Sequence, residues 1–165
     1  MKKIALLLVC LMVGISTSFA QRKANSSIGF NLNYASETSF GIGVRYQMPI
    51  ANNFRIEPEF NFYFDKESTF YWDLGASLSY LFPIASDVTI YPLVGLGFMR
   101  ASADADPSRV TDNGVLARVG AGVEFQVSPK VKLLLEPKYQ YNNLEGWFTE
   151  TNNQFIITAG IAYTF

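Results

Sequence analysis

The chain has 165 residues, of which 49% are hydrophobic, 15% aromatic and only 16% charged, and its formal net charge is −1. A domain usually contains roughly 100 to 200 residues, so the length fits one domain with or without a targeting segment. The aromatic content and low net charge exclude a disordered chain, and the lack of a basic excess excludes a nucleic-acid surface. No helical membrane bundle is expected either, since each helical span needs about 20 consecutive apolar residues.

Residues 1–20 have the features of a secretory signal peptide. Two lysines precede an uncharged apolar run, and the small residues Ser18 and Ala20 occupy the positions that a signal peptidase reads. The apolar run is too short for a transmembrane anchor. We therefore expect cleavage between Ala20 and Gln21, which leaves residues 21–165 as the mature domain.

Cysteine and histidine are both missing from the expected mature chain. The single cysteine, Cys10, lies inside the signal peptide, and the sequence contains no histidine. A thiolate metal site, a disulfide and a thiol nucleophile are therefore excluded, and we expect no metal and no cofactor. Lipid-modifying outer-membrane enzymes depend on histidine for acid–base chemistry, so enzymatic activity is not expected and that class remains a weaker alternative.

From residue 28 onward the sequence alternates. Turn-like clusters separate eight runs in which every second residue is apolar or aromatic. These runs cover residues 28–34, 40–48, 54–64, 70–82, 88–98, 115–127, 131–141 and 155–165. A period of two over runs of this length predicts strands, because successive side chains of a strand point to opposite faces.

The two faces of these strands differ in kind. The apolar phase is bulky and carries no charge, whereas the other phase is rich in glycine, serine and asparagine and carries five basic and five acidic residues. The ten charged residues are Arg45, Arg55, Glu57, Glu59, Asp73, Arg118, Glu124, Lys132, Glu136 and Lys138. An apolar exterior around a polar interior is typical of a β-barrel in lipid, where unpaired strand edges are not tolerated. A soluble ligand-binding calyx would have the opposite arrangement.

The connections between runs indicate the topology. Three are short, at 49–53, 83–87 and 128–130, whereas two at the opposite end are longer, at 100–114 and 142–153. Short periplasmic turns and long extracellular loops are the rule in outer-membrane barrels. We therefore predict an all-β fold, an eight-stranded antiparallel up-and-down transmembrane β-barrel with both termini in the periplasm.

The last run carries a resemblance to a known family. It ends in Tyr163-Thr164-Phe165, which resembles the C-terminal assembly signal of bacterial outer-membrane barrels. Together with the signal peptide and the eight runs, the chain resembles the small OmpA/OmpX-type family. The resemblance implies a monomer in the outer membrane of a Gram-negative-type bacterium. Its expected partners are membrane lipid and the barrel assembly machinery, the latter recognising Tyr163 and Phe165.

The inward charges predict a filled lumen. The interior of an eight-stranded barrel is just wide enough for side chains, so we expect a neutral plug of ion pairs. If the turn after residue 48 centres on Ala51, Arg45 lies directly across from Glu57, and Gln47 from Arg55. A narrow porin-like channel through the same charges is the alternative interpretation.

The loops are the remaining place for a function. Trp147 and Phe148 lie near the tip of the last long connection. Exposed aromatic residues are enriched at binding surfaces. The sequence therefore predicts a structural or surface-interaction role, such as adhesion or binding, with Trp147 and Phe148 as candidate contacts for a surface ligand that the sequence does not identify.

Overall fold

The computed structural model describes residues 25–36, 39–64, 69–105, 108–145 and 153–165. These residues form nine strands. The strands are β1 (Ser27–Ala35), β2 (Ser39–Pro49), β3 (Phe54–Phe64), β4 (Thr69–Tyr80), β5 (Phe82–Pro83), β6 (Val88–Ala105), β7 (Ser108–Ser128), β8 (Val131–Glu145) and β9 (Gln154–Thr164). No helix in this part of the chain is long and apolar enough to cross a membrane.

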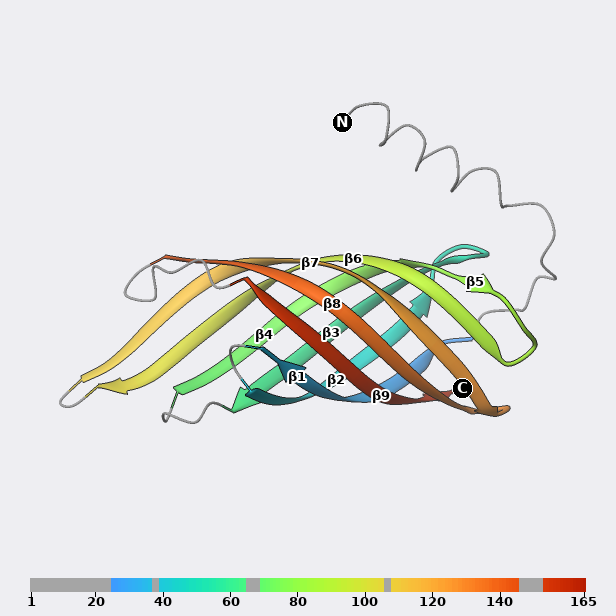
Figure 1. The fold of residues 1–165 in the computed structure, drawn as a ribbon, viewed down its shortest axis with the longest axis horizontal. Coiled ribbons are helices and arrows are strands. Elements are labelled where there is room, and N and C mark those ends of the chain that lie inside the picture. Colours follow the sequence, from blue (N-terminus) through green and yellow to red (C-terminus); the bar gives the residue numbers. More distant parts are fainter. Residues whose placement is uncertain (1–24, 37–38, 65–68, 106–107, 146–152) are drawn as a thin grey trace, which may run out of the picture.

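Eight of the strands close into an antiparallel barrel (Figure 1). Neighbours in sequence pair with each other, β1 pairs with β9, and β4 pairs with β6. The predicted up-and-down barrel is thereby confirmed. We call the end that holds Asn25, Phe165 and the turns 50–53, 84–87 and 129–130 the terminal end, and the opposite end the loop end. Short turns face the periplasm in outer-membrane barrels, so the sequence-based prediction assigns the terminal end to the periplasmic side.

The run predicted at 70–82 is two strands. β4 stops at Tyr80, and the two-residue β5 pairs separately with β6. The break lies opposite Pro92 of β6, which has no N–H to donate, and the register is the same on both sides of it, with Ser79 paired to Leu93 and Phe82 to Ile90. On the other edge of the strand, the backbone oxygen of Asn53 accepts a hydrogen bond from the Leu81 N–H at 2.7 Å. Its side-chain amide also donates to the Leu81 carbonyl at 2.8 Å. The N–H and the carbonyl of Leu81 therefore extend the pairing of β4 with β3 by one residue into the turn before β3.

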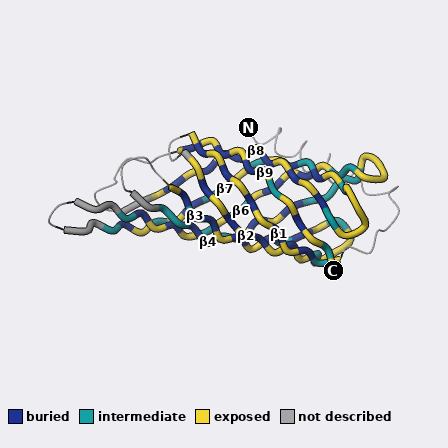
Figure 2. Tube along the Cα trace, turned by 90° about the horizontal axis from the view of Figure 1, so that it is seen from below, coloured by how far each residue is buried: buried dark blue, intermediate teal, exposed yellow. Residues whose placement is uncertain are grey.

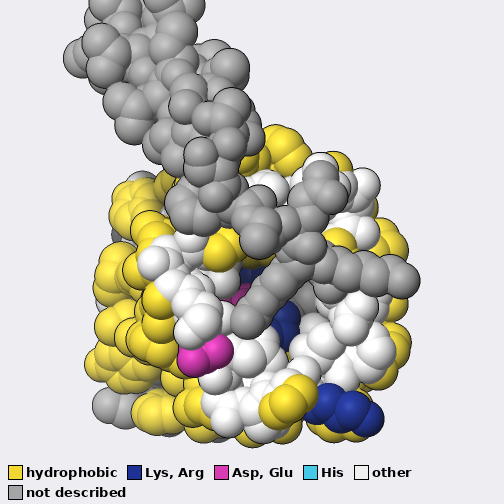
Figure 3. Space-filling view, turned by 90° about the vertical axis from the view of Figure 1, so that its right-hand side faces the viewer, with side chains coloured by type: hydrophobic (Ala, Val, Ile, Leu, Met, Phe, Trp, Pro, Cys, Tyr) yellow, Lys and Arg dark blue, Asp and Glu magenta, His cyan; other side chains and the backbone are white. Residues whose placement is uncertain are grey.

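Burial alternates along the strands as the sequence pattern predicts (Figure 2). Leu96 and Phe98 are 72% and 67% exposed, whereas Tyr91 is 1% exposed. Seen from the terminal end, hydrophobic side chains surround the barrel, and charged side chains lie in the hollow at its centre (Figure 3). The apolar phase is thus the outer surface and the charged phase is the interior.

The long connection predicted at 100–114 is mostly strand. β6 continues to Ala105 and β7 begins at Ser108, with pairing out to the hydrogen-bonded neighbours Ala105 and Ser108. A transmembrane strand needs only about 9 to 11 residues. The 18 residues of β6 and the 21 of β7 therefore extend past the membrane, and this hairpin projects beyond the other strands at the loop end (Figure 1). The prediction failed because small and polar residues can continue a backbone ladder without showing apolar alternation.

The predicted register between β2 and β3 is wrong by two residues. Arg45 is paired with Glu59 and Pro49 with Arg55, so neither Glu57 nor Arg55 takes the predicted place. The turn centres on Asn52, because the N–H of Ile50 donates to the carbonyl of Phe54 at 3.0 Å. Register depends on turn geometry, which the alternation alone does not specify.

The interior is also less polar than predicted. Toward the loop end, Ala35, Tyr63 and Ile156 form a buried apolar cluster, and Met99 and Leu116 form a second one. Tyr71 packs against both. The sequence places these residues in the same inward phase as the charges, so the lumen toward the loop end contains apolar side chains as well as polar ones.

Three outward prolines lie where strand pairing is interrupted. Pairing of β2 with β3 skips the position of Pro58, pairing of β7 with β8 skips that of Pro137, and pairing of β4 with β6 ends just before Pro92. Proline has no N–H to donate, so it cannot complete a ladder on that side. In all three cases the register is the same on both sides of the gap, so the strands do not slip.

Candidate functional site

The ten charged residues predicted to face the lumen are all buried. Nine ion pairs among the described residues join them into one unbranched sequence in which positive and negative groups strictly alternate. From the terminal end the order is Lys132, Glu124, Arg55, Glu57, Arg45, Glu136, Lys138, Glu59, Arg118, Asp73. We refer to these residues as the ion-pair chain. With five groups of each sign, it carries no net charge.

Arg55 anchors the chain at the terminal end. Its Nε donates to Glu57 at 2.9 Å and its Nη1 donates to Glu124 at 2.6 Å. Lys132 approaches the other oxygen of Glu124 at 3.0 Å. Glu124 is therefore shared by two cations from two different strands, β3 and β8.

Arg45 occupies the centre of the chain. Its two terminal nitrogens bind the two oxygens of Glu136 at 2.5 and 2.8 Å, a bidentate arrangement that fixes the guanidinium plane. The same side chain reaches Glu57 at 3.3 Å and donates its Nε to Asn31 at 2.8 Å. Four strands, β1, β2, β3 and β8, thus meet at one arginine.

Arg118 closes the chain near the loop end. It binds Glu59 at 2.5 Å and Asp73 at 2.6 Å, and its Nε donates to Gln140 at 2.5 Å. Asp73 also accepts a hydrogen bond from Asn61 at 3.0 Å. Each buried charge in this region therefore has a partner of opposite sign or a neutral hydrogen-bond donor, as burial in a low-dielectric interior requires.

Three sequence segments of the same type meet at the centre. Each has an inward residue immediately before an outward proline, and these inward residues are Glu57, Tyr91 and Glu136. The Tyr91 hydroxyl donates to Glu136 at 2.7 Å, while Arg45 bridges Glu136 and Glu57. The weak repeat visible in the sequence is therefore also a spatial cluster.

The sequence did not reveal the two inward tyrosines as part of the site. Tyr63 lies across the ladder from Gly41, and Tyr91 lies across from Gly122. In both cases a Cβ added to the glycine would overlap the tyrosine ring. The sequence does contain a signal for these two residues, because each is an aromatic residue at an inward position, where most neighbours are small. A large ring inside the barrel needs a glycine beside it to leave room.

The other predicted site residues are not part of this cluster. Tyr163 and Phe165 are exposed on the outer surface at the terminal end, where the Phe165 ring lies 6.3 Å from that of Tyr46. The Phe165 N–H donates to Ser26 at 3.1 Å, which ties the last residue to the first strand. Ala20, Gln21, Trp147 and Phe148 lie outside the described residues.

The arrangement favours a plug over a catalytic or metal centre. Among the described residues, no group of three or more acidic, histidine or cysteine side chains is placed to hold a metal ion. The acidic groups of the chain are instead held against guanidinium and ammonium groups. Such contacts fix side chains in place and cross-link strands that are distant in sequence.

Comparison with solved structures finds barrels of the same shape at low sequence identity. Neisserial surface protein A is 22% identical, with a TM-score of 0.68, over 85% of this chain and 96% of that chain. Outer membrane protein H of P. aeruginosa is 16% identical, with a TM-score of 0.67, over 86% and 100%. Ail of Yersinia pestis, in complex with the heparin analogue sucrose octasulfate, is 18% identical, with a TM-score of 0.56, over 86% and 97%.

Comparison with curated proteins finds no match to this sequence. A protein family described as the outer membrane protein beta-barrel domain matches residues 5–165, nearly the whole chain. The closed antiparallel barrel, its apolar outer surface and its charged lumen agree with that match. The chain therefore belongs to the outer membrane protein beta-barrel domain family and resides in the outer membrane of a Gram-negative bacterium.

Proposed function

We propose that this protein is a non-enzymatic surface-interaction protein, in which a filled barrel holds extracellular loops for contact with a partner. The ion-pair chain is the observation that carries the proposal. Its ion pairs link five strands, β2, β3, β4, β7 and β8, across the lumen, and the hydrogen bonds of Arg45 with Asn31 and of Tyr91 with Glu136 add β1 and β6. A rigid plugged barrel suits the presentation of loops better than it suits transport.

The β6–β7 hairpin supports an extracellular role. Its strands continue well past the length needed to cross the membrane, and they are paired up to Ala105 and Ser108. Arg100, on the outer surface, is paired with Asn113, so polar side chains replace apolar ones at this level. The hairpin provides an ordered projection on which a partner can bind.

The charge of the loop end indicates what kind of partner fits. Residues 36–38, 65–68, 100–113 and 142–153 together contain eight acidic and three basic residues, a net charge of −5. Electrostatic steering at such a surface favours cationic partners and disfavours anionic ones. Ail, a barrel of the same fold, is known in complex with a sulfated heparin analogue. The acidic loop end distinguishes this chain from a binder of that kind.

The proposal includes the route to the membrane. We propose that the signal peptide is cleaved between Ala20 and Gln21 and that the barrel assembly machinery recognises Tyr163 and Phe165. The exposure of the Phe165 side chain, at 63%, is compatible with such recognition. We propose a monomer, since the outward apolar residues are distributed around the barrel, where lipid can cover them.

Adhesion of whole cells tests the proposed function. Cells that display the protein should be retained on a surface coated with a cationic polypeptide and not on one coated with sulfated glycan. Changing Trp147→Ala and Phe148→Ala together should reduce retention at least several-fold, because aromatic anchors dominate most binding surfaces. Retention is measured as the fraction of cells that resist washing.

The matched control removes two apolar residues at the opposite end. Ile50 and Ile84 are 55% and 59% exposed in turns at the terminal end, so Ile50→Ala with Ile84→Ala should leave retention unchanged. Equal amounts of folded protein are verified by the difference in gel mobility before and after boiling. Equal retention of cells with and without the protein would contradict the proposal.

Planar bilayers separate this function from the channel alternative. We expect the wild-type barrel to show no steady single-channel conductance, because the ion-pair chain occupies the lumen from Lys132 to Asp73. Changing Glu124→Gln, near the periplasmic mouth, should not open a path, since Arg45 and Glu136 remain in place deeper in the lumen. Regular conductance steps from the wild-type protein would favour the channel instead.

A further inference from the structure

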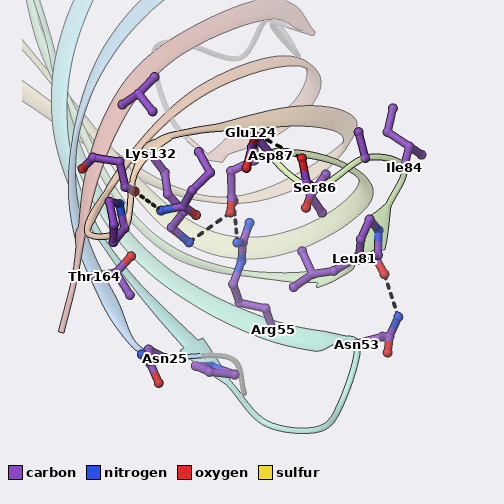
Figure 4. A pocket seen from close by; sticks show the side chains of 18 of the residues that line it. Asn25, Asn53, Arg55, Leu81, Ile84, Ser86, Asp87, Glu124, Lys132 and Thr164 are labelled. Carbon is purple, nitrogen blue, oxygen red and sulfur yellow. Dashed lines mark hydrogen bonds and ion pairs between the residues drawn. The ribbon is translucent and has the colours of Figure 1, made fainter. Parts of the chain in front are cut away.

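A pocket of about 880 Å³ opens at the terminal end of the barrel, on the opposite side of the membrane from the proposed function. Its rim comprises the turns after β2, β5 and β7. Arg55, Glu124 and Lys132, the first three members of the ion-pair chain, line it, and their side chains point toward one another there (Figure 4). The charged end of the chain is therefore accessible from the periplasm.

The first cation of the chain has hydrogen-bonding capacity left over. Lys132 has one acidic partner among the described residues, Glu124, although an ammonium group has three N–H donors. Because the chain alternates in sign, the position beyond Lys132 is one that an anion would occupy. The ion-pair chain therefore begins with a positive residue, Lys132, at the terminal end and finishes with a negative one, Asp73, toward the loop end.

Arg55 supplies a second unused donor at the same place. Its Nε and Nη1 are bound to Glu57 and Glu124, whereas its Nη2 has no hydrogen-bond partner among the described residues. Arg55 is only 3% exposed, and it lines the pocket. A buried guanidinium N–H without a partner is costly, so a ligand or solvent oxygen is expected beside it.

The acidic groups of the pocket do not cancel these donors. Glu124 is already neutralised by two cations, at 2.6 and 3.0 Å. Asp87 lies exposed among the lining residues, where it accepts a hydrogen bond from Ser86 at 3.1 Å. Of the acidic side chains in the described lining, Asp87 is therefore the one without a cationic partner there. Its negative charge should weaken the binding of an anion in the pocket.

We propose that this pocket binds an oxyanion, a phosphate or carboxylate group, between the Arg55 Nη2 and the Lys132 Nζ. Charge-assisted hydrogen bonds from these two groups would hold the anion. The volume lies within the range of roughly 300 to 1,000 Å³ that is usual for small-molecule sites, so the anionic group can belong to a larger polar molecule. The amide and hydroxyl side chains of Asn52, Thr89 and Thr164 line the same space.

Titration with inorganic phosphate tests the site. The refolded protein in zwitterionic micelles at low ionic strength is titrated, and the amide resonances of Thr89 and Gln126, two lining residues, are followed by NMR. We expect a saturable shift. Lys132→Gln should raise the Kd for phosphate by about tenfold or more, since it removes a charged hydrogen-bond donor. Asp87→Asn should lower the Kd several-fold, because it removes a negative charge that repels phosphate.

Lys130→Gln is the matched control, because Lys130 lies at the same end but over the Tyr163 ring on the outer surface, at 5.8 Å. It should leave the Kd unchanged. Lys132 is at the end of the ion-pair chain, so its replacement is chosen over that of Arg55, whose loss would orphan two carboxylates. Absence of a saturable shift, or an equal Kd for wild type and Lys132→Gln, would overturn the proposal.

Lipid nanodiscs distinguish two sources of the anion. If a lipid headgroup is the natural ligand, nanodiscs of phosphatidylglycerol should block the phosphate response that is seen in phosphatidylcholine. If a soluble molecule is the ligand, the response should persist in both. Either result requires the same donors, and neither depends on the loops at the other end of the barrel.

Discussion

Replacing Arg45 by alanine should destabilise the barrel by about 3 to 5 kcal/mol, the usual cost of breaking a buried ion pair by removing one partner. Arg45 binds both oxygens of Glu136 and one oxygen of Glu57. Its removal leaves two buried carboxylates with fewer counter-charges in a region without access to bulk water. The free energy of unfolding is measured by urea titration of the protein in lipid vesicles, with tryptophan fluorescence as the signal.

Two further variants establish the cause of that loss. Arg100→Ala removes an arginine that is exposed on the outer surface, and it should change stability by no more than about 0.5 kcal/mol. Combining Arg45→Ala with Glu136→Gln should recover part of the loss, because one of the orphaned charges is then gone. If Arg45→Ala costs less than about 1 kcal/mol, the ion-pair chain does not stabilise the lumen.

Gly122→Ala should destabilise the barrel, because it adds a methyl group where the lumen is filled by the Tyr91 ring. The new Cβ would overlap the Tyr91 ring and lie 2.6 Å from its hydroxyl oxygen. Overpacking of this type costs about 1 to 3 kcal/mol. Displacing Tyr91 would also remove the 2.7 Å hydrogen bond to Glu136 and the stacking of Arg55 over the ring at 4.8 Å. The measurement is the same urea titration.

A double-mutant cycle separates the overlap from other effects of the substitution. In a Tyr91→Ala background the space is empty, so Gly122→Ala should cost less than about 0.5 kcal/mol. Gly75→Ala is a control in the same inward phase, where the nearest atoms to a new Cβ are the Leu96 carbonyl at 3.0 Å and the Gly97 Cα at 3.5 Å. An equal cost of Gly122→Ala with and without Tyr91 would show that the tyrosine is not the obstacle.

The direction of the ion-pair chain gives the two ends of the barrel different properties. Its positive end opens into a pocket at the terminal end, while its negative end lies toward the loop end, where apolar clusters pack around Tyr71. The loop end is acidic, and the chain leading into Asn25 contains two basic residues, Arg22 and Lys23. The two proposed binding sites, at opposite ends of one small barrel, would therefore take partners of opposite charge.

The sequence by itself determines which side chains face outward and which face the lumen. Alternation with a period of two assigns each residue to the lipid or to the lumen, because a strand has only two faces. The ten inward charges and the outward residues such as Leu96 and Phe98 were identified in this way. The balance of five basic and five acidic inward residues also predicted a neutral interior, since unmatched charges cannot be buried.

The pairing of those charges was decided by the tertiary structure alone. Arg45 and Glu136 are 91 positions apart, and Arg55 and Glu124 are 69 positions apart, so their contacts depend on closure of the barrel. The register of β2 on β3 depended on a turn centred on Asn52, and the break between β4 and β5 lies opposite Pro92 of the neighbouring β6. Alternation determines which face of the sheet a side chain occupies, whereas closure and register determine which side chains lie next to each other across the strands. A register shift of two residues keeps every side chain on its face but changes its neighbours.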